Sequence, residues 1–184
     1  MKLRQMILIA IFAALTGIGA FIKIPTPIVP YTLQYLFCAY SGIFLGGRDG
    51  LYSQILYISI GLVGFPIFAS GGGPAYILQP TFGYLLGFAA GAYIIGVLIE
   101  KIKTISFVKI FSTITLGLMM VYAFGVSYMY IIVNFYLNKQ MDIMRAIAIG
   151  FTPYIIFDLG LNIIITITAL RIIPILRKSG YLKK

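Results

Sequence analysis

The sequence lacks histidine and tryptophan, and it has one cysteine and only four acidic residues among 184. Without histidine, and with so few carboxylates, it lacks the usual ligands of a metal site and the acid–base pair of an enzyme active site. The single cysteine, Cys38, excludes an intrachain disulfide, and its position within an apolar run predicts a packing role. No phosphate-binding Gly-x-x-x-x-Gly-Lys-Ser/Thr motif is present, so we expect no bound cofactor and no ATP hydrolysis by this chain.

Charge is also scarce, and apolar residues take its place. The chain is 61% hydrophobic and 10% charged, with a mean hydropathy of +1.03. Soluble domains are usually about half apolar and a quarter charged, so these values predict an integral membrane protein. The formal net charge of +10 would suit nucleic acid, but the basic residues flank the apolar runs. We therefore interpret them as topology signals and expect a lipid bilayer, and no nucleic acid, as the partner.

Six apolar runs predict an all-α protein with one domain over residues 1–184. The start of the chain resembles a signal peptide, but no polar cleavage region follows residues 18–21, so we expect a retained first helix. The second and third runs are short for a bilayer span, and residues 46–50 predict a turn between them. Residues 138–148 predict a surface segment or a short interfacial helix. The expected spans are residues 6–22, 32–45, 51–65, 81–99, 110–137 and 153–173.

The basic residues predict the orientation of these spans. With six spans and both termini in the cytoplasm, eleven of the 14 Lys and Arg residues lie inside. Only Lys23, Lys139 and Arg145 lie outside, which is the expected excess of cytoplasmic positive charge. The inside residues are Lys2, Arg4, Arg48, Lys101, Lys103, Lys109, Arg171, Arg177, Lys178, Lys183 and Lys184. The three outer loops then carry the turn-forming residues, as expected of a multi-pass protein that captures something from the medium.

Residues 64–87 form the largest loop-like segment, and the chain is organised around it. The segment contains three consecutive glycines, Gly71, Gly72 and Gly73, and the prolines Pro66, Pro74 and Pro80. Glycine lets a backbone approach a ligand closely, and proline stiffens the neighbouring turns. The loop is either a lid over a binding site or a plain connector.

The last span holds the only acidic residue within an apolar run, Asp158. We expect Thr152 to cap this helix and Pro153 to occupy its first turn, which places Asp158 about 8 Å below the outer end. Four polar residues recur every four positions and share one face: Tyr154, Asp158, Asn162 and Thr166. This face must line a cavity or the bundle interior, where it serves a ligand or bonds between helices.

Two further sets of residues are candidates for function. The first span carries small residues on one side, Ala10, Ala13, Ala14 and Gly17, which let another helix approach closely. That helix belongs either to this chain or to a partner. Thr32 and Gln34 are polar residues at the start of the second span, whereas we expect Asn134 to be structural.

Taken together, these features resemble the BioY family, the biotin-capture subunits of energy-coupling-factor (ECF) vitamin importers. Four segments in this order carry the resemblance: Ile24-Pro25-x-Pro27-x-Val29-Pro30-Tyr31-Thr32-Leu33-Gln34; Gly61-Leu62-x-Gly64-x-Pro66-x-Phe68-Ala69-x-Gly71-Gly72; Pro80-Thr81-x-Gly83-Tyr84-Leu85-Leu86-Gly87-Phe88; and Pro153 with Asp158 five residues later. The resemblance covers most of the chain.

The resemblance implies a six-helix protein of the prokaryotic cytoplasmic membrane with an outward-facing vitamin pocket. It implies that Asp158 and Asn162 bond the polar head of biotin, while Tyr84 and the backbone of Gly71, Gly72 and Gly73 close over it. Thr32 and Gln34 would line the outer mouth. It also implies an EcfT-type scaffold subunit that meets the first helix at Ala10, Ala13, Ala14 and Gly17. Two ABC ATPases would use ATP, and the subunit would topple to release its ligand inside.

Two positions depart from the family pattern. Leu161 stands where the family usually has a lysine one turn after the acid, and Gln79 stands where a glycine is common. Asn162 can donate and accept hydrogen bonds, but it cannot neutralise a carboxylate. The alternatives are therefore a capture subunit for another small vitamin or a biotin precursor, or a stand-alone proton-coupled carrier that uses Asp158. An intramembrane enzyme is the remaining class.

Overall fold

The computed structural model describes residues 2–25 and 29–180. Over these residues the predicted, mostly helical architecture is confirmed, with one short antiparallel hairpin in which Lys23 pairs with Thr32. The elements are α1 (Leu3–Phe21), β1 (Lys23–Ile24), β2 (Tyr31–Thr32), α2 (Gln34–Leu45), α3 (Gly47–Val63), the 3-10 helix η1 (Pro74–Leu78), α4 (Phe82–Lys101), α5 (Phe107–Ile131), the π-helical turn η2 (Ile132–Tyr136), α6 (Ile143–Gly150) and α7 (Thr152–Lys178). Pro27, Lys183 and Lys184, which the sequence analysis used, lie outside the described residues.

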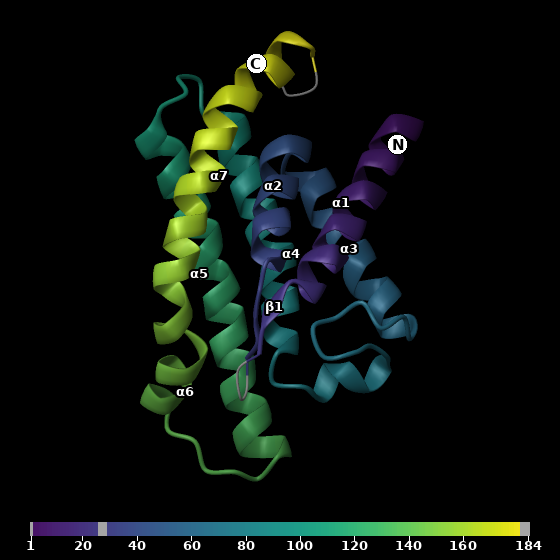
Figure 1. Ribbon diagram of the computed structural model, residues 1–184, viewed down its shortest axis with the longest axis vertical. Helices are drawn as coiled ribbons and strands as arrows, with labels where there is room; N and C mark the ends of the chain where they lie inside the picture. The colour runs from purple at the N-terminus through teal and green to yellow at the C-terminus, as the bar shows by residue number, and fades with distance from the viewer. Residues whose placement is uncertain (1, 26–28, 181–184) are drawn as a thin grey trace.

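The helices run up and down along one axis. In Figure 1, α1 begins and α7 ends at the top of the bundle. The β-hairpin, the segment that contains η1, and the short helix α6 lie toward the opposite end. The three loops that the sequence analysis grouped on one side therefore do gather at one end of the molecule.

Four helices within the described residues are long and apolar enough to cross a membrane: α1, α4, α5 continued by η2, and α7. Helix α2 has 12 residues and α3 has 17, which is fewer than the roughly 20 that a perpendicular span requires. The expectation that the second and third segments are short is therefore confirmed. The chain is a membrane protein, and the number of its spans follows from how α2 and α3 lie in the bilayer.

Helix α4 is the centre of the bundle. Its apolar segment is 61% buried, against 33% for α1 and 28% for α7. Gly83, Gly87 and Gly91 lie one turn apart on its face toward α5. A Cβ on Gly87 would stand 2.7 Å from Val121 Cα, and one on Gly91 would stand 3.0 Å from the Gly117 carbonyl oxygen. The two backbones touch along this line, so the main small-residue contact is in α4 rather than in α1.

The break between α2 and α3 is tighter than the sequence suggests. The turn expected over residues 46–50 is a single residue, Gly46, with φ of 85°, and α3 begins at Gly47. The Gly47 N–H donates to Glu100 Oε1 at 3.1 Å, so a side chain from α4 satisfies the start of α3. The expectation of a longer turn was wrong because this acceptor comes from a distant part of the chain.

The last helix also differs at both ends from the prediction. Its N-cap is Phe151 rather than Thr152, and Thr152 lies inside the first turn with its hydroxyl 3.4 Å from the Ile147 carbonyl oxygen. Helix α7 continues past residue 173 to Lys178 with Pro174 inside it. Near the end, Arg177 donates to carbonyl oxygens that follow α4, at 2.6 Å for Ile102. This tertiary contact extends the helix beyond the proline that would otherwise favour its end.

The glycine-rich segment is a folded structure rather than an open loop. Gly71 and Gly73 have φ of 115° and 101°, which residues with a Cβ rarely adopt. Phe68 and Gly71 exchange backbone hydrogen bonds at 2.8 and 3.2 Å, and the Gly73 N–H donates to the Gly61 carbonyl at 2.7 Å. The three glycines therefore form a tight turn that folds back onto the end of α3.

The sequence predicted either a surface segment or a short helix over residues 138–148, and the structure shows the short helix α6 over residues 143–150. Asp142 caps α6, and its side chain accepts from the Met144 N–H at 3.2 Å. Asn134 is structural, as predicted: its amide donates to the carbonyls of Tyr130 and Met141 at 3.0 Å each. Cys38 is fully buried, which confirms its packing role.

Candidate functional site

A cavity opens at the end of the bundle where the hairpin and the glycine-rich segment meet. It holds about 600 Å³ of empty space, part of it open solvent. Side chains from β2, α2, η1, α4, α5 and α7 line it, so no single segment of sequence defines it. The lining residues are Val29, Pro30, Tyr31, Thr32, Gln34, Tyr35, Ala69, Tyr76, Thr81, Tyr84, Leu85, Phe88, Leu118, Val121, Tyr122, Tyr154 and Asp158.

Asp158 supplies the only carboxylate among these lining residues. The polar face predicted for the last span is confirmed as an interior face, since Tyr154, Asp158, Asn162 and Thr166 are all buried. The Tyr122 hydroxyl donates to Asp158 Oδ2, and Tyr31 forms a second hydrogen bond to the same carboxyl group. Hydroxyl donors therefore hold a buried carboxylate that retains further acceptor capacity for a ligand.

Tyr31 belongs to the hairpin and closes this group from the outer side. Its ring stacks on Tyr154 with centroids 6.2 Å apart and planes 1° apart. Burial raises the pKa of Tyr31, and the negative charge of Asp158 raises it further. The Tyr31 hydroxyl is thus kept protonated at neutral pH, and it acts as a donor toward the carboxylate.

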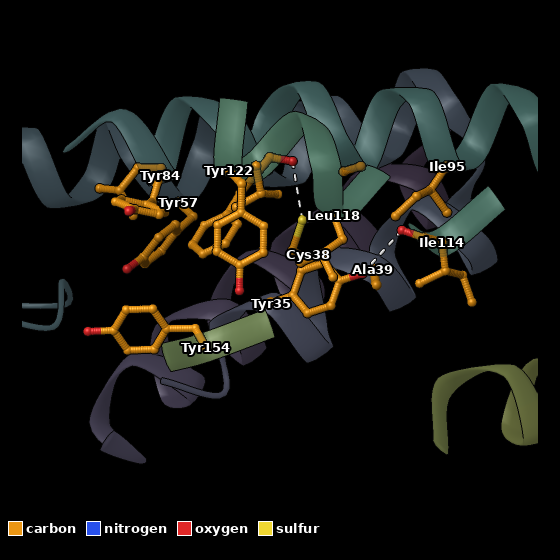
Figure 2. Close-up of a cluster of buried hydrophobic side chains, with 14 of the residues drawn as sticks. Tyr35, Cys38, Ala39, Tyr57, Tyr84, Ile95, Ile114, Leu118, Tyr122 and Tyr154 are labelled. Carbon is orange, nitrogen blue, oxygen red and sulfur yellow. Dashed lines mark hydrogen bonds between the residues drawn. The ribbon is translucent and has the colours of Figure 1, made fainter. Parts of the chain in front are cut away.

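The floor of the cavity is set by Tyr35 and the residues behind it. The Tyr35 hydroxyl donates to Asn162 Oδ1 at 2.7 Å and lies 3.2 Å from the Ile114 carbonyl oxygen. Asn162 in turn donates to Thr115 Oγ1 at 3.2 Å. Figure 2 shows Tyr35, Tyr84, Tyr122 and Tyr154, which come from four different helices, together with the Tyr35–Ile114 bond. Asn162 is fully buried behind this layer and orients Tyr35.

Thr32 and Gln34 form a fixed polar edge at the hairpin. The Thr32 hydroxyl donates to Gln34 Oε1 at 2.9 Å, and Gln34 Nε2 donates to the Tyr57 hydroxyl at 2.8 Å. Tyr57 donates onward to the Ile67 carbonyl at 3.0 Å. This chain of bonds links the hairpin to α3 and to the glycine-rich segment, so the edge of the cavity is preorganised.

The structure brings together half of the ligand-binding residues predicted from sequence. Thr32, Gln34, Tyr84 and Asp158 line the cavity. Asn162 does not line the cavity and lies behind Tyr35. The three glycines at 71–73 do not line it either, whereas Ala69 from the same segment does. The Tyr84 hydroxyl donates to the Gly150 carbonyl at 2.8 Å, so its ring rather than its hydroxyl faces the cavity.

The small residues of α1 divide between two faces. Ala13 and Gly17 are buried within the chain, and a Cβ on Gly17 would meet the Tyr57 ring at 3.7 Å. Ala10 and Ala14 are exposed. The first pair therefore packs against this chain's own helices, and the second pair is accessible to another molecule.

Sequence reasoning missed most of the tyrosines that line the cavity. Tyr31, Tyr35, Tyr76 and Tyr122 all contribute, although none was singled out as a binding residue. Tyr31 and Tyr35 lie four residues apart in the sequence, on either side of Thr32 and Gln34, and two aromatic residues that flank a polar pair were an available signal. Tyr122 carried none, because only the fold brings it to Asp158.

The chain is similar to known proteins over nearly its whole length. The model of the BioY family matches residues 1–178. A Lysinibacillus sphaericus protein described as "Probable biotin transporter BioY" is 43% identical over 179 residues, covering 97% of this chain and 91% of that protein. The chain belongs to the BioY family. The "Biotin transporter BioY" of Thermotoga maritima is 40% identical over 171 residues, covering 92% of this chain and 96% of that one.

A solved structure shows the same fold as this BioY-family chain. It is described as the "Crystal structure at 2.1 A of the S-component for biotin from an ECF-type ABC transporter". The TM-score is 0.81 at 22% sequence identity, and the match covers 93% of this chain and 91% of that one. At this identity the likeness establishes the fold alone.

Proposed function

We propose that this chain is the membrane-embedded biotin-capture subunit of an ECF-type importer, and not an enzyme. The observation that carries the proposal is the cavity, in which one carboxylate held by tyrosines faces apolar and aromatic walls. Biotin has a ureido ring with two N–H donors and a mostly apolar body. Asp158 can accept from the ureido N–H groups, while Leu85, Phe88 and Leu118 contact the apolar body.

The proposed site comprises the predicted residues that line the cavity, Thr32, Gln34, Tyr84 and Asp158, together with Tyr31 and Tyr122. Asn162 acts through Tyr35, and Gly71, Gly72 and Gly73 act by shaping the turn that presents Ala69. Leu161 in place of the usual lysine is compatible with this arrangement, because the ureido group is uncharged and needs no cation beside Asp158.

We propose six membrane segments with both termini in the cytoplasm of a prokaryotic cell. The basic residues that favour this orientation lie mostly at the end where α1 begins and α7 ends. The cavity then opens outward. Helices α2 and α3 would cross obliquely as a pair joined at Gly46.

We further propose that an EcfT-type scaffold docks on α1 and that two ABC ATPases supply ATP hydrolysis, since this chain has no phosphate-binding motif. The exposed pair Ala10 and Ala14 supports the docking site. A stand-alone proton-coupled carrier is the alternative, and it predicts uptake that follows the proton gradient in cells without the ATPases. A capture subunit for another small vitamin would be recognised by the identity of the molecule that it binds.

The test is calorimetric titration of detergent-purified, ligand-stripped protein with biotin. We expect a nanomolar dissociation constant, which corresponds to about 12 kcal/mol of binding free energy. Absence of heat with biotin, combined with a different small molecule identified by mass spectrometry in the unstripped protein, would contradict the proposal and name the true ligand.

A further inference from the structure

Lys23 lies beside the cavity and contacts two of its lining residues, although it is not itself a lining residue. It is the first residue of β1, where it pairs across the hairpin with Thr32. Its Nζ donates to the carbonyl oxygen of Ala69. Thr32 and Ala69 both line the cavity, so Lys23 links the hairpin to the glycine-rich segment at the edge of the cavity.

The charges around the cavity favour one orientation of a negatively charged ligand. None of the described lining residues is a lysine or an arginine, and Asp158 is the one carboxylate among them. A second negative charge near Asp158 would be repelled in a low-dielectric site. A ligand with a carboxylate is therefore oriented with that group toward the mouth.

The geometry points to Lys23 as the residue that binds the carboxylate of the captured ligand. This inference rests on the function proposed above, because biotin has an acid chain at the end opposite its ureido ring. An ammonium group has three N–H bonds, and one is directed to Ala69, so two can be donated to a carboxylate. Lys23 would thus provide a cation near the cavity, whereas the last helix has Leu161 at the position where the family usually has a lysine.

The other outer cations belong to a different surface. Lys139 and Arg145 line a second depression together with Gln79, Gln140 and Met141, and this depression shares no lining residue with the cavity. Lys139 therefore offers a matched control, since it is also an exposed lysine on the outer end of the bundle.

The experiment compares biotin with its methyl ester, which is the same molecule without the negative charge. Both are titrated into the wild-type protein and into Lys23→Met, Lys23→Arg and Lys139→Met. We expect Lys23→Met to weaken biotin binding about tenfold, at the low end for a hydrogen bond to a charged group because Lys23 is exposed. We expect the affinity for the ester to stay unchanged, Lys23→Arg to restore biotin binding, and Lys139→Met to change neither.

Other results overturn the inference. Equal weakening of acid and ester by Lys23→Met would show that Lys23 only holds the two loops together, and no weakening would remove it from the site. Equal affinity of the wild-type protein for acid and ester would show that no cation holds the carboxylate, even if Lys23→Met fails to fold. In these cases wild-type binding persists and the proposed function stands. If the wild-type protein binds neither compound, the proposed function itself fails.

Discussion

Asp158 illustrates how a polar residue is kept within a membrane bundle. An isolated carboxylate there is costly, and here two tyrosine hydroxyls from α5 and the hairpin satisfy it. Because Tyr31 belongs to the hairpin, its bond to the carboxylate also helps fix the hairpin over the cavity. The same group thus has a structural role without a ligand and an acceptor role with one.

We expect Asp158→Asn to weaken biotin binding about 10- to 100-fold, because a neutral amide accepts hydrogen bonds less strongly than a carboxylate. The fold should persist, since the Asn carbonyl can still accept from Tyr122. Titration calorimetry measures the affinity, and the unfolding temperature in detergent reports the fold. Asp142→Asn is the matched control, because asparagine is also a good N-cap and Asp142 lies outside the cavity. Unchanged affinity in Asp158→Asn would remove this residue from the site.

At this scale the sequence correctly predicted that Asp158 and its polar face lie in the interior, but it could not show their neighbours. The period of four residues is a local property of one helix, so it was visible in the sequence. The contact between Tyr122 and Asp158 depends on how α5 packs against α7, across 36 residues of chain. The depth of Asn162 behind Tyr35 likewise follows from packing, which is why Asn162 was predicted to touch the ligand directly.

The contact between α4 and α5 determines where the cavity walls stand. Glycines on α4 let the two backbones meet, and α4 contributes Tyr84, Leu85 and Phe88 while α5 contributes Leu118, Val121 and Tyr122. A change in the distance between the two helices would therefore displace one wall relative to the other.

Gly87→Val is expected to destabilise the protein by about 1–3 kcal/mol, because the new side chain would meet backbone atoms of Val121 that cannot rotate away. Thermal unfolding in detergent measures the effect. Gly160→Val on α7 is the control, since a Cβ there meets no atom within 4 Å and should leave the unfolding temperature nearly unchanged. Equal stability of the two variants would contradict the close α4–α5 contact.

The element boundaries show why the sequence predicted helices better than their ends. Each of the six apolar runs corresponds to an observed helix, because hydrophobic length is a local signal. The start of α3 and the end of α7 depend on Glu100 and Arg177, whose partners lie more than 50 residues away in the chain. The spacing of Gly83, Gly87 and Gly91 is visible in the sequence and predicts a close helix contact on α4. The small residues of α1 form a weaker pattern of the same kind.

At the scale of the whole molecule, the docking proposed above would separate capture from transport on the two faces of α1. Ala13 and Gly17 face this chain, so they belong to the fold, whereas Ala10 and Ala14 face outward among exposed isoleucines such as Ile7 and Ile11. A partner that docks here would contact none of the cavity residues directly.

Accordingly, Ala14→Leu should abolish or strongly reduce biotin uptake by cells while leaving biotin binding by the purified protein unchanged. The added bulk would keep a partner helix from close approach. Uptake of labelled biotin and calorimetry give the two readouts. Gly160→Leu, an equivalent enlargement at an exposed position of α7, should preserve both. Reduced binding in Ala14→Leu, with co-purification of the scaffold intact, would show that this face supports the cavity instead.

The length of α5 has a consequence for how a ligand arrives. With η2 it spans 30 residues, or about 45 Å, and even a 40° tilt leaves about 34 Å along the membrane normal, more than the hydrocarbon thickness of about 30 Å. Tyr128, Tyr130 and Tyr136 at its far end suit the headgroup layer. Tyr128 donates to the carbonyl of Ile77, the neighbour of the cavity-lining Tyr76, so in the proposed topology the rim of the cavity would stand at headgroup level. A water-soluble vitamin could then reach the proposed site without dissolving in lipid.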